Sequence, residues 1–364
     1  MSAPIIVLAD DLSGAAEAAA VFLDRQTCVA LQLTPGQPAG PGVTVIDLNT
    51  RTMSAPDARR AHRDALATVA PDAMVFKKID SLLRGHIGTE VAVLAERGPV
   101  TVAAALPALG RTVIGGVLHI DGIPLHRTGA WAAETSTPPS TVTELFGADV
   151  VVCDAVTDAD LDAVLRDAAP GTQFVGTAAL AAAAARTLAP GTPQPPPRRD
   201  PSVLLAVVGT AEPTAAEQVR RLIEHGFGHL PVAAAALLNG SADPGRLVLA
   251  LDSGPVVLTI GGEVRPGQAR ELSAALGKLV AQGQFQHRPD LILTGGETAR
   301  AVIDAIGLTE LRPVHQVHHG AVVSVASDGR NVATRPGSFG DHDSLVAIAD
   351  HLTPHVHPQP KDKS

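Results

Sequence analysis

The feature that most constrains the fold is an alternation of short apolar runs with segments of helical spacing, which occurs twice along the chain. In the first half, apolar runs of strand length predict buried strands, and the segments between them predict helices. The strands are expected at Ile5–Ala9, Val43–Leu48, Ala73–Ile79, Val100–Leu106 and Val150–Cys153, and the helices at Gly14–Arg25, Ala55–Val69 and Ser81–Glu96. This alternation predicts a parallel sheet with helices on both faces.

The alternation stops at a proline-rich tract, APGTPQPPPRRDPS, and restarts after it. Clustered prolines remove backbone donors and fix φ, so we interpret the tract as an interdomain linker, with an ordinary loop as the alternative. Beyond it, strands are expected at Val203–Val208, Val256–Thr259, Leu291–Thr294 and Val322–Val325, and helices at Thr214–His225, Gly267–Gln282 and Thr298–Ile306. We therefore expect two α/β domains, each a mostly parallel sheet flanked by helices, at 1–189 and 203–354, joined by a linker at 190–202 and followed by a frayed tail at 355–364.

Composition excludes several classes of protein. The net charge of -9 and the lack of any basic block with aromatics argue against a nucleic-acid partner. The two cysteines, Cys28 and Cys153, form no CxxC pair, which predicts reduced thiols in a cytoplasmic protein. Neither a signal peptide nor a membrane anchor is expected. The Ala-rich stretch Thr177–Ala189 is too short to span a bilayer and predicts a surface or interdomain helix.

Ligand sites of open α/β sheets lie beyond the carboxyl ends of strands, where the first predicted strand runs into the sequence ADDLSGA. An Asp or Ser there can cap the following helix, which is the simpler interpretation. Two adjacent carboxylates, Asp10 and Asp11, beside Gly14 favour a function. One could accept a hydroxyl proton in phosphoryl transfer while the other holds neighbouring hydroxyls or a metal-bound water.

The third predicted strand ends in Lys77-Lys78-Ile79-Asp80-Ser81-Leu82-Leu83-Arg84-Gly85-His86. Lys78 and Arg84 can neutralise a carboxylate or phosphate, and Asp80 can bind hydroxyls. Ser81 would lie near a helix N-terminus, which favours anions. A solvated strand edge is the alternative.

A third segment, Pro107–Arg111, is followed by Gly115-Gly116 and Asp121-Gly122. These glycines fit either a substrate loop or a β-hairpin, and their spacing favours the hairpin. Arg111 is the residue of this segment with a candidate binding role.

In the second half, three glycine-containing turns are candidates for phosphate binding: Val208–Thr214, Thr294–Ala299 and Arg335–Asp341. Each alone is weak, because such turns are common in α/β proteins that bind no nucleotide. The chain has no P-loop and no dinucleotide fingerprint. His315, His318 and His319 are expected in a solvated strand-to-turn segment rather than around a metal.

In their order along the chain, the motifs resemble those of the four-carbon acid sugar kinases, a family formerly grouped as a domain of unknown function. The resemblance spans nearly the whole chain. Its strongest elements are ADDLSGAAEAA from Ala9, KKIDSLLRGHIGTE from Lys77 and ALPALGRTVIGGVLHIDGIPL from Ala105; the weaker ones are VVGTAEPTAAEQ from Val207, LTGGETARAV from Leu293 and RPGSFGDHDSL from Arg335.

The resemblance implies an N-terminal domain that binds the acid sugar, a C-terminal domain that binds ATP with Mg²⁺, and an active site in the interdomain cleft. Known members phosphorylate D-threonate, D-erythronate, L-threonate or 3-oxo-tetronates at the 4-hydroxyl. The implied catalytic residues are Asp11 and Asp10, and the implied substrate-binding residues are Lys78, Asp80, Ser81, Arg84, Gly85 and Arg111. The implied nucleotide-binding residues are Thr210, Glu212, Gly295, Gly296, Glu297, Thr298 and Gly337. Of the two acids, Asp11 is favoured as the base because it lies farther from the buried strand.

The chain departs from the family pattern at Leu82 and His86, where the family usually has Thr and Asn, and at Glu212, Arg335 and Pro336 in the nucleotide loops. A carboxylate near ATP phosphates repels them unless Mg²⁺ bridges the two. These changes favour the alternative function, a small-molecule binding or sensor protein derived from such a kinase. An aldolase or dehydrogenase is disfavoured, and the sequence leaves open which acid is used and whether the chain forms a homodimer.

Overall fold

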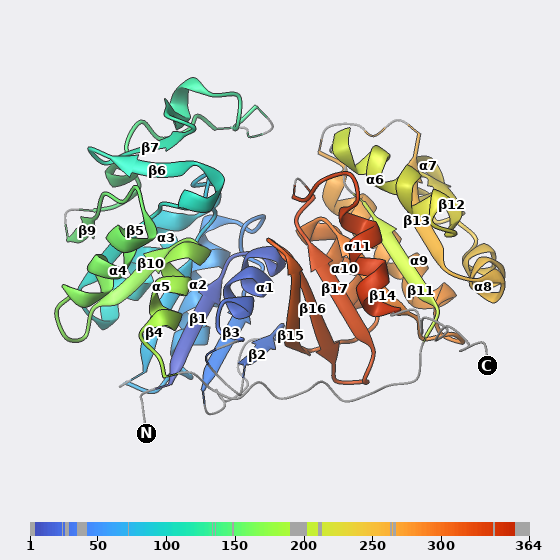
Figure 1. The fold of residues 1–364 in the computed structure, drawn as a ribbon, viewed down its shortest axis with the longest axis horizontal. Coiled ribbons are helices and arrows are strands. Elements are labelled where there is room, and N and C mark those ends of the chain that lie inside the picture. The colour runs from blue at the N-terminus through green and yellow to red at the C-terminus, as the bar shows by residue number, and fades with distance from the viewer. Residues whose placement is uncertain are drawn as a thin grey trace, which may run out of the picture. The chain divides into compact units, whose positions relative to one another are not determined.

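The structure, a computed structural model, describes residues 4–23, 25, 29–34, 42–71, 73–132, 134, 136–147, 149–189, 202–209, 213–262, 264, 267–337 and 339–353. The chain divides into two compact units, Met1–Pro196 with Thr309–His315, and Pro197–Leu308 with Gln316–Ser364. Each unit is an α/β layer structure, as expected from the sequence (Figure 1). Among the described residues, no helix is both long and apolar enough to cross a membrane.

The sheet of the first unit is parallel, apart from one strand at its edge. Its order is β2-β3-β1-β4-β10-β5-β9, and Glu310 and Leu311 of β15 (Glu310–His318) pair antiparallel with β2. The strands are β1 (Ile5–Ala9), β2 (Val29–Gln32), β3 (Val43–Asp47), β4 (Met74–Lys78), β5 (Val100–Ala103), β9 (Val150–Val152) and β10 (Gln173–Gly176). β1 is buried along its whole length, as expected for a central parallel strand.

The helices of the first unit cover both faces of this sheet. They are α1 (Leu12–Ala20), α2 (Ala55–Leu66), α3 (Ile87–Leu94), α4 (Asp158–Arg166) and α5 (Ala178–Arg186). α1, α4 and α5 pack together, and α2 packs on α3. Side-chain caps start several of these helices: Ser54 bonds to the N–H of Asp57 for α2, and Thr157 forms a capping box with Asp160 for α4.

Two expectations for the first unit were wrong. The helix predicted at Ser81–Glu96 begins only at Ile87, because Leu83 and Gly85 have φ of 64° and 93°, which no α-helix accommodates. The Ala-rich helix α5 is not a surface helix: nearly all of its residues are buried, and it packs on α1, α4, β4 and β10 of its own unit. Small Ala side chains allow that close helix-on-sheet packing.

The glycine-rich segment after Arg111 forms the predicted hairpin, extended by a third strand. Strands β6 (Arg111–Ile114), β7 (Val117–Ile120) and β8 (Ile123–Pro124) pair antiparallel as a separate sheet. Gly115 and Gly116 turn with φ of 59° and 72° between the first two strands, in the manner that such hairpins require. Arg111 therefore lies at the start of the hairpin.

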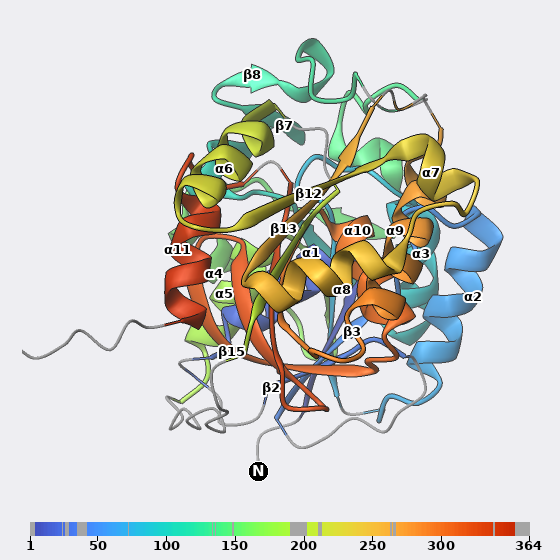
Figure 2. The same ribbon diagram turned by 90° about the vertical axis from the view of Figure 1, so that its right-hand side faces the viewer.

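The second unit repeats the parallel pattern around β11. Its sheet has the order β12-β13-β11-β14-β17-β16, in which only the β16–β17 pair is antiparallel. The strands are β11 (Leu204–Val208), β12 (Gly228–Ala233), β13 (Val256–Gly261), β14 (Asp290–Thr294), β16 (Ala321–Ala326) and β17 (Asn331–Arg335). The helices are α6 (Pro213–Glu224), α7 (Ala234–Leu238), α8 (Pro244–Ser253), α9 (Ala269–Gly283), α10 (Gly296–Ala305) and α11 (Ser344–Leu352). α6 packs with α11, whereas α7, α8 and α10 pack on α9 (Figure 2).

Candidate functional site

The first candidate site lies where three parallel strands of the first unit end together. β1 lies between β3 and β4, so the chain winds to one side of β1 and then to the other. Such a switch point leaves a crevice at the carboxyl ends of the strands, where α/β proteins bind ligands. Asp10 and Asp11 follow β1, the turn 49–51 follows β3, and Asp80 follows β4.

Arg51 connects these three segments. Its Nε donates a hydrogen bond to Asp10 Oδ2 at 2.8 Å, and its Nη1 donates one to Asp11 Oδ2 at 2.9 Å. Its Nη2 lies 3.9 Å from Asp80 Oδ1. One guanidinium group therefore faces three carboxylates. We call Asp10, Asp11, Arg51, Asp80 and Arg84 the Arg51 cluster.

Sequence reasoning did not identify Arg51. The signal that could have found it is the polar turn 49–51 directly after the apolar run Val43–Leu48. That turn occupies the same position relative to β3 as the two aspartates do relative to β1, at the carboxyl end of a buried parallel strand.

The charges of the Arg51 cluster stabilise one another. Burial by itself raises the pKa of Asp10, but the positive charges of Arg51 and Lys77 outweigh it and lower that pKa. Burial likewise raises the pKa of Asp80, and the Arg51 charge with the Arg84 hydrogen bond brings it well below its usual range. Burial disfavours the charged form of Arg51, yet Asp10 and Asp11 raise its pKa well above the usual value. Asp10, Asp80 and Arg51 are therefore ionised at neutral pH.

Asp11 has a capping role and a position in the cluster at the same time. Its Oδ1 accepts a hydrogen bond from the N–H of Gly14 at 2.9 Å and thereby caps α1. The side chain of Asp11 is 19% exposed, whereas that of Asp10 is 2% exposed. Asp10 Oδ1 is buried and accepts no hydrogen bond in the structure. Asp11 is thus the more accessible acid, and Asp10 carries a vacant acceptor.

Gly14 is required by this packing. A Cβ at this position would lie 2.7 Å from Asp11 Oδ1 and 2.9 Å from Lys78 Nζ. Only glycine lets the first turn of α1 approach both side chains so closely.

The adjacent lysines of β4 point to opposite faces of the sheet, as successive residues of a strand do. Lys78 Nζ donates to the carbonyl oxygen of Ile79 at 3.0 Å and lies 3.6 Å from Glu17 Oε2 on α1. Lys77 Nζ lies 2.9 Å from Glu90 Oε2 on α3. Both lysines are buried, so the alternative of a solvated strand edge was wrong.

Asp80 and Arg84 form a bidentate ion pair. Arg84 Nε donates to Asp80 Oδ2 at 2.7 Å, and Arg84 Nη2 donates to Asp80 Oδ1 at 2.9 Å. The backbone N–H groups of Leu82 and Arg84 also donate to Asp80 Oδ2, each at 3.2 Å. Asp80 therefore organises the turn that Gly85 completes with φ of 93°.

Arg111 reaches this turn from the hairpin. Its Nη1 donates a hydrogen bond to Ser81 Oγ, while its Nε is buried without a hydrogen-bond partner. Within the described residues, no carboxylate lies within ion-pair distance of Arg111. Burial lowers the pKa of its guanidinium, since the charge is desolvated without a close counter-ion.

The residues at which the chain departs from the family pattern in this turn have partners of their own. The carbonyl oxygen of Leu82 accepts a hydrogen bond from Trp131 Nε1 at 2.7 Å, and His86 Nε2 lies 2.6 Å from the carbonyl oxygen of Met53. Trp131, which sequence reasoning did not identify, anchors the backbone of this turn at Leu82.

The second candidate site lies at the corresponding switch point of the second unit, where β11 separates β13 from β14. A cavity of about 570 Å³ opens there, within the size range of cofactor pockets. It is lined by Val208, Gly209, Ile260, Gly262, Val264, Ala269, Leu272, Ser273, Gly295, Gly296, Glu297 and Thr298. Four of the predicted nucleotide residues, at 295–298, thus meet in one cavity.

The N-terminus of α10 provides the polar end of this cavity. Gly295 has φ of 91° and turns the chain from β14 into the helix. The N–H groups of a helix N-terminus bind anions, and no side chain occupies the cap of this one. Gly209 must be glycine, because a Cβ there would overlap the side chain of Thr298. Burial raises the pKa of Glu297.

The remaining predicted nucleotide residues are not gathered in this cavity. Thr210 and Glu212 lie outside the described residues. Gly337 does not line the cavity. The loop that contains Gly337 nevertheless starts close to the cavity, because the N–H of Gly295 donates to the carbonyl oxygen of Arg335 at 2.9 Å. The buried Arg335 side chain supports this loop by donating to Gln218 Oε1 at 2.8 Å and to the carbonyl oxygen of Phe339. Burial lowers the pKa of Arg335 to about 10.

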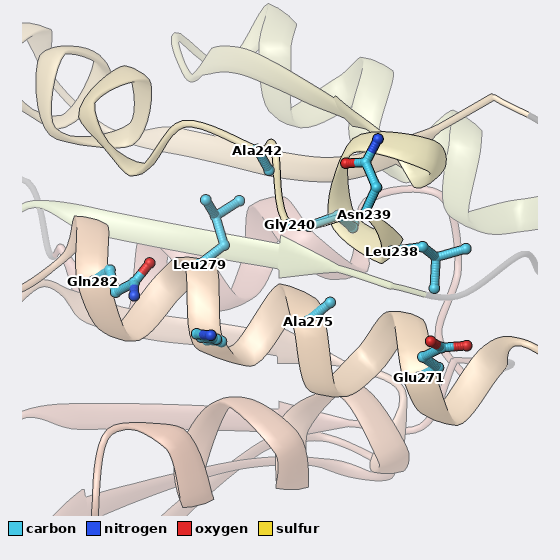
Figure 3. Close-up of a pocket in the computed structure, with 10 residues that line it drawn as sticks. Leu238, Asn239, Gly240, Ala242, Glu271, Ala275, Leu279 and Gln282 are labelled. Carbon is cyan, nitrogen blue, oxygen red and sulfur yellow. The ribbon is translucent and has the colours of Figure 1, made fainter.

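A separate cavity of about 480 Å³ lies between α9 and the segment from α7 to Ala242. Figure 3 shows Glu271, Ala275, Leu279 and Gln282 in sequence along one side of α9, opposite that segment. None of the predicted site residues lines it.

Family models match both halves of the chain. A sugar-binding N-terminal domain matches residues 5–148, and a nucleotide-binding C-terminal domain matches residues 205–345. A D-threonate kinase from Cupriavidus necator is 30% identical over 93% of this chain and 96% of its own length. A D-erythronate kinase from Heliobacterium modesticaldum is 26% identical over 96% of this chain and 97% of its own length.

Solved structures share the fold. A protein from Salmonella typhimurium LT2 superposes with a TM-score of 0.79 at 21% identity and covers 96% of this chain and 99% of its own. A Haemophilus influenzae protein superposes with a TM-score of 0.71 at 20% identity, covering 95% and 100%. At this identity the likeness concerns the fold alone.

Proposed function

Because the chain belongs to the four-carbon acid sugar kinase family, we propose that it transfers the γ-phosphoryl group of ATP to the 4-hydroxyl of a four-carbon sugar acid. D-Threonate, D-erythronate and a 3-oxo-tetronate are the candidate acids. The first unit binds the acid at the Arg51 cluster, and the second unit binds ATP at the cavity beside α10.

The observation that carries this proposal is the unsatisfied charge of Arg111. Its guanidinium group is half-buried with its Nε fully covered, yet it bonds to the neutral hydroxyl of Ser81 and has no carboxylate partner among the described residues. A substrate carboxylate would supply the missing counter-ion in a bidentate geometry that arginine favours. Arg84, by contrast, is already engaged by Asp80.

The acids of the cluster are suited to hydroxyl groups. Asp11 is accessible, and a carboxylate in this position can accept a hydrogen bond from the 4-hydroxyl and take its proton as the new bond forms. The vacant Oδ1 of Asp10 can accept a second hydroxyl of the acid. Phosphoryl transfer depends mainly on positioning and charge stabilisation, and Lys78 and Arg51 supply positive charge nearby.

The nucleotide phosphates would lie at the N–H groups of Gly295 to Thr298. Mg²⁺ in kinases is held by one or two carboxylates together with substrate phosphates. Within the described ranges, no group of three or more His, Cys, Asp and Glu residues that could hold a metal occurs. Glu297, at the start of α10, could bind a water molecule of the Mg²⁺ that accompanies ATP.

The alternative function, a binding or sensor protein without catalysis, is not favoured, because the relatives that match nearly the whole chain are kinases. No side-chain hydrogen bond caps the N-terminus of α10, which supports a phosphate site there.

A coupled assay with Mg-ATP and a panel of four-carbon aldonates and 3-oxo acids tests the proposal, and NMR of the product locates the phosphate. Arg111→Gln should raise the KM for the acid about ten- to hundredfold, because hydrogen bonds to charged groups contribute about 1.5–3 kcal/mol. The KM for ATP should stay unchanged. An enzyme that turns over no acid of this class would exclude the proposed function.

A further inference from the structure

A buried ion pair that the proposed mechanism does not use lies next to the Arg51 cluster. Lys77 on β4 and Glu90 on α3 are each 1% exposed, and Lys77 Nζ lies 2.9 Å from Glu90 Oε2. Apolar residues of similar volume often stabilise a core as well as a buried ion pair does. Stability alone therefore gives little reason for two charges at this place.

The second oxygen of Glu90 binds the turn that carries Arg51. Thr50 Oγ1 donates to Glu90 Oε1 at 2.5 Å, and Thr50 is fully buried. The next residue, Arg51, donates its backbone N–H to the carbonyl oxygen of Asp10 at 3.1 Å. A continuous set of contacts thus runs from Lys77 through Glu90 and Thr50 to Arg51.

His62 on α2 lies beside the Lys77–Glu90 ion pair. Its Nε2 lies 3.8 Å from Glu90 Oε2, and its Nδ1 lies 3.0 Å from the carbonyl oxygen of Ala58. Burial and the charge of Lys77 lower the pKa of His62 to about 4, so the imidazole is neutral at neutral pH. Around Glu90, the charged and titratable groups are therefore Lys77 on β4, His62 on α2 and Asp10 after β1.

We propose that Lys77, Glu90 and Thr50 are positioning residues for the phosphoryl transfer. Together they hold the turn 49–51 in the conformation in which Arg51 bonds to both Asp10 and Asp11. The proposal rests on the proposed function for its kinetic consequence, but its structural content is independent of the substrate.

Thr50→Val tests the proposal with little change of shape, because valine keeps the branched side chain and lacks only the hydroxyl. Thr50→Ser is the matched variant that restores the hydroxyl. We expect kcat for the acid to fall at least tenfold in the valine variant and to return close to the parental value in the serine variant. The KM for ATP should be unchanged in both. Equal kcat values for valine and serine variants would overturn the proposal.

A second variant removes the ion pair itself. Lys77→Met with Glu90→Gln takes away both charges without leaving either one buried alone. We expect kcat to fall while the KM for ATP stays unchanged, because the turn 49–51 loses its buried support. Arg330→Met with Asp328→Asn is the control: it removes both charges of another ion pair, in the second unit, and should leave kcat close to the parental value. A parental kcat in the Lys77 and Glu90 double variant would count against the proposal.

Crystal structures of the Thr50 variants separate this inference from the proposed function. A parental protein that phosphorylates no four-carbon acid would exclude the function, and the position of Arg51 would still be measurable. We expect Arg51 to lose its hydrogen bond to Asp10 or Asp11 in Thr50→Val and to keep both in Thr50→Ser. Retention of both bonds in the valine variant would overturn the inference.

Discussion

Arg51 and Asp10 are joined by two hydrogen bonds, one from backbone to backbone and one from side chain to side chain. The N–H of Arg51 donates to the carbonyl oxygen of Asp10 at 3.1 Å, and Arg51 Nε donates to Asp10 Oδ2 at 2.8 Å. The turn after β3 and the end of β1 are therefore held in one arrangement. The orientation of the Asp10 carboxylate, with its second oxygen vacant, follows from it.

The first prediction is that replacing Arg51 will reduce turnover and shift its pH dependence. Arg51→Met leaves three carboxylates without their shared counter-charge, so the pKa of Asp10 and that of Asp80 should rise. Asp10, which we propose accepts a hydroxyl of the acid, then becomes protonated at higher pH, which moves the acidic limb of the kcat/KM profile upward. Arg51→Lys keeps the charge but cannot bond to two carboxylates through a planar fork, so we expect a smaller shift with a similar loss of kcat. Steady-state kinetics across the pH range measures both.

The second prediction concerns Asp11 as the base. Asp11→Asn keeps a side chain that can cap α1, so the fold should remain intact by circular dichroism. Loss of the charge should lower kcat by about a hundred- to ten-thousandfold. Asp10→Asn should instead weaken binding of the acid. Near-parental turnover in both variants, together with inactivity of Lys78 or Arg84 variants, would assign the reaction to the cationic residues.

Much of the sheet architecture could be predicted because buried parallel strands have continuous apolar sequences. β1, β3 and β11 lie within a residue of their predicted bounds. β10 and β12 were missed, because short strands with Gln, Gly or Pro lack that pattern. The expected helix start at Ser81 failed because the backbone there is set by Asp80, whose oxygens accept hydrogen bonds from the N–H groups of Leu82 and Arg84.

The grouping of side chains at the first candidate site could be predicted where the residues directly follow a strongly apolar strand. Asp10 and Asp11 met this condition, and the structure brings Asp80 and Arg84 next to them. Arg51 was missed because its importance comes from the sheet order: only the placement of β3 beside β1 brings it to the aspartates. The polar turn after the apolar run marks Arg51 as a candidate, but no local sequence pattern gives the pairing of β3 with β1.

The third prediction tests the nucleotide cavity. Gly296→Val should raise the KM for ATP strongly, because a branched side chain at the first residue of α10 would occupy the place where phosphates approach the helix N–H groups. The KM for the acid should change little. Gly147→Val is the matched control, since a Cβ at Gly147 meets no atom within 4 Å. An unchanged KM for ATP in Gly296→Val would place the nucleotide elsewhere.

The last prediction is that His62 makes the protein less stable as the pH falls from 7 to 5. Burial lowers the pKa of His62 to about 4, whereas in the unfolded chain a histidine has a pKa of about 6.5. Between these two pKa values the histidine is protonated in the unfolded state but neutral in the folded state. The free energy of unfolding therefore decreases as the pH falls. The expected loss between pH 7 and pH 5 is about 2 kcal/mol. The carboxylates of Asp10, Asp80 and Glu90 do not obscure this loss of stability. Folding lowers their pKa values, so their stabilising contributions are present at pH values above their unfolded pKa values near 4 and are lost only at lower pH.

Urea denaturation at pH 7 and pH 5 measures the difference in the free energy of unfolding, and His62→Gln should remove most of that difference whatever its effect on stability at pH 7. A difference of the same size in the glutamine variant would show that another group is responsible.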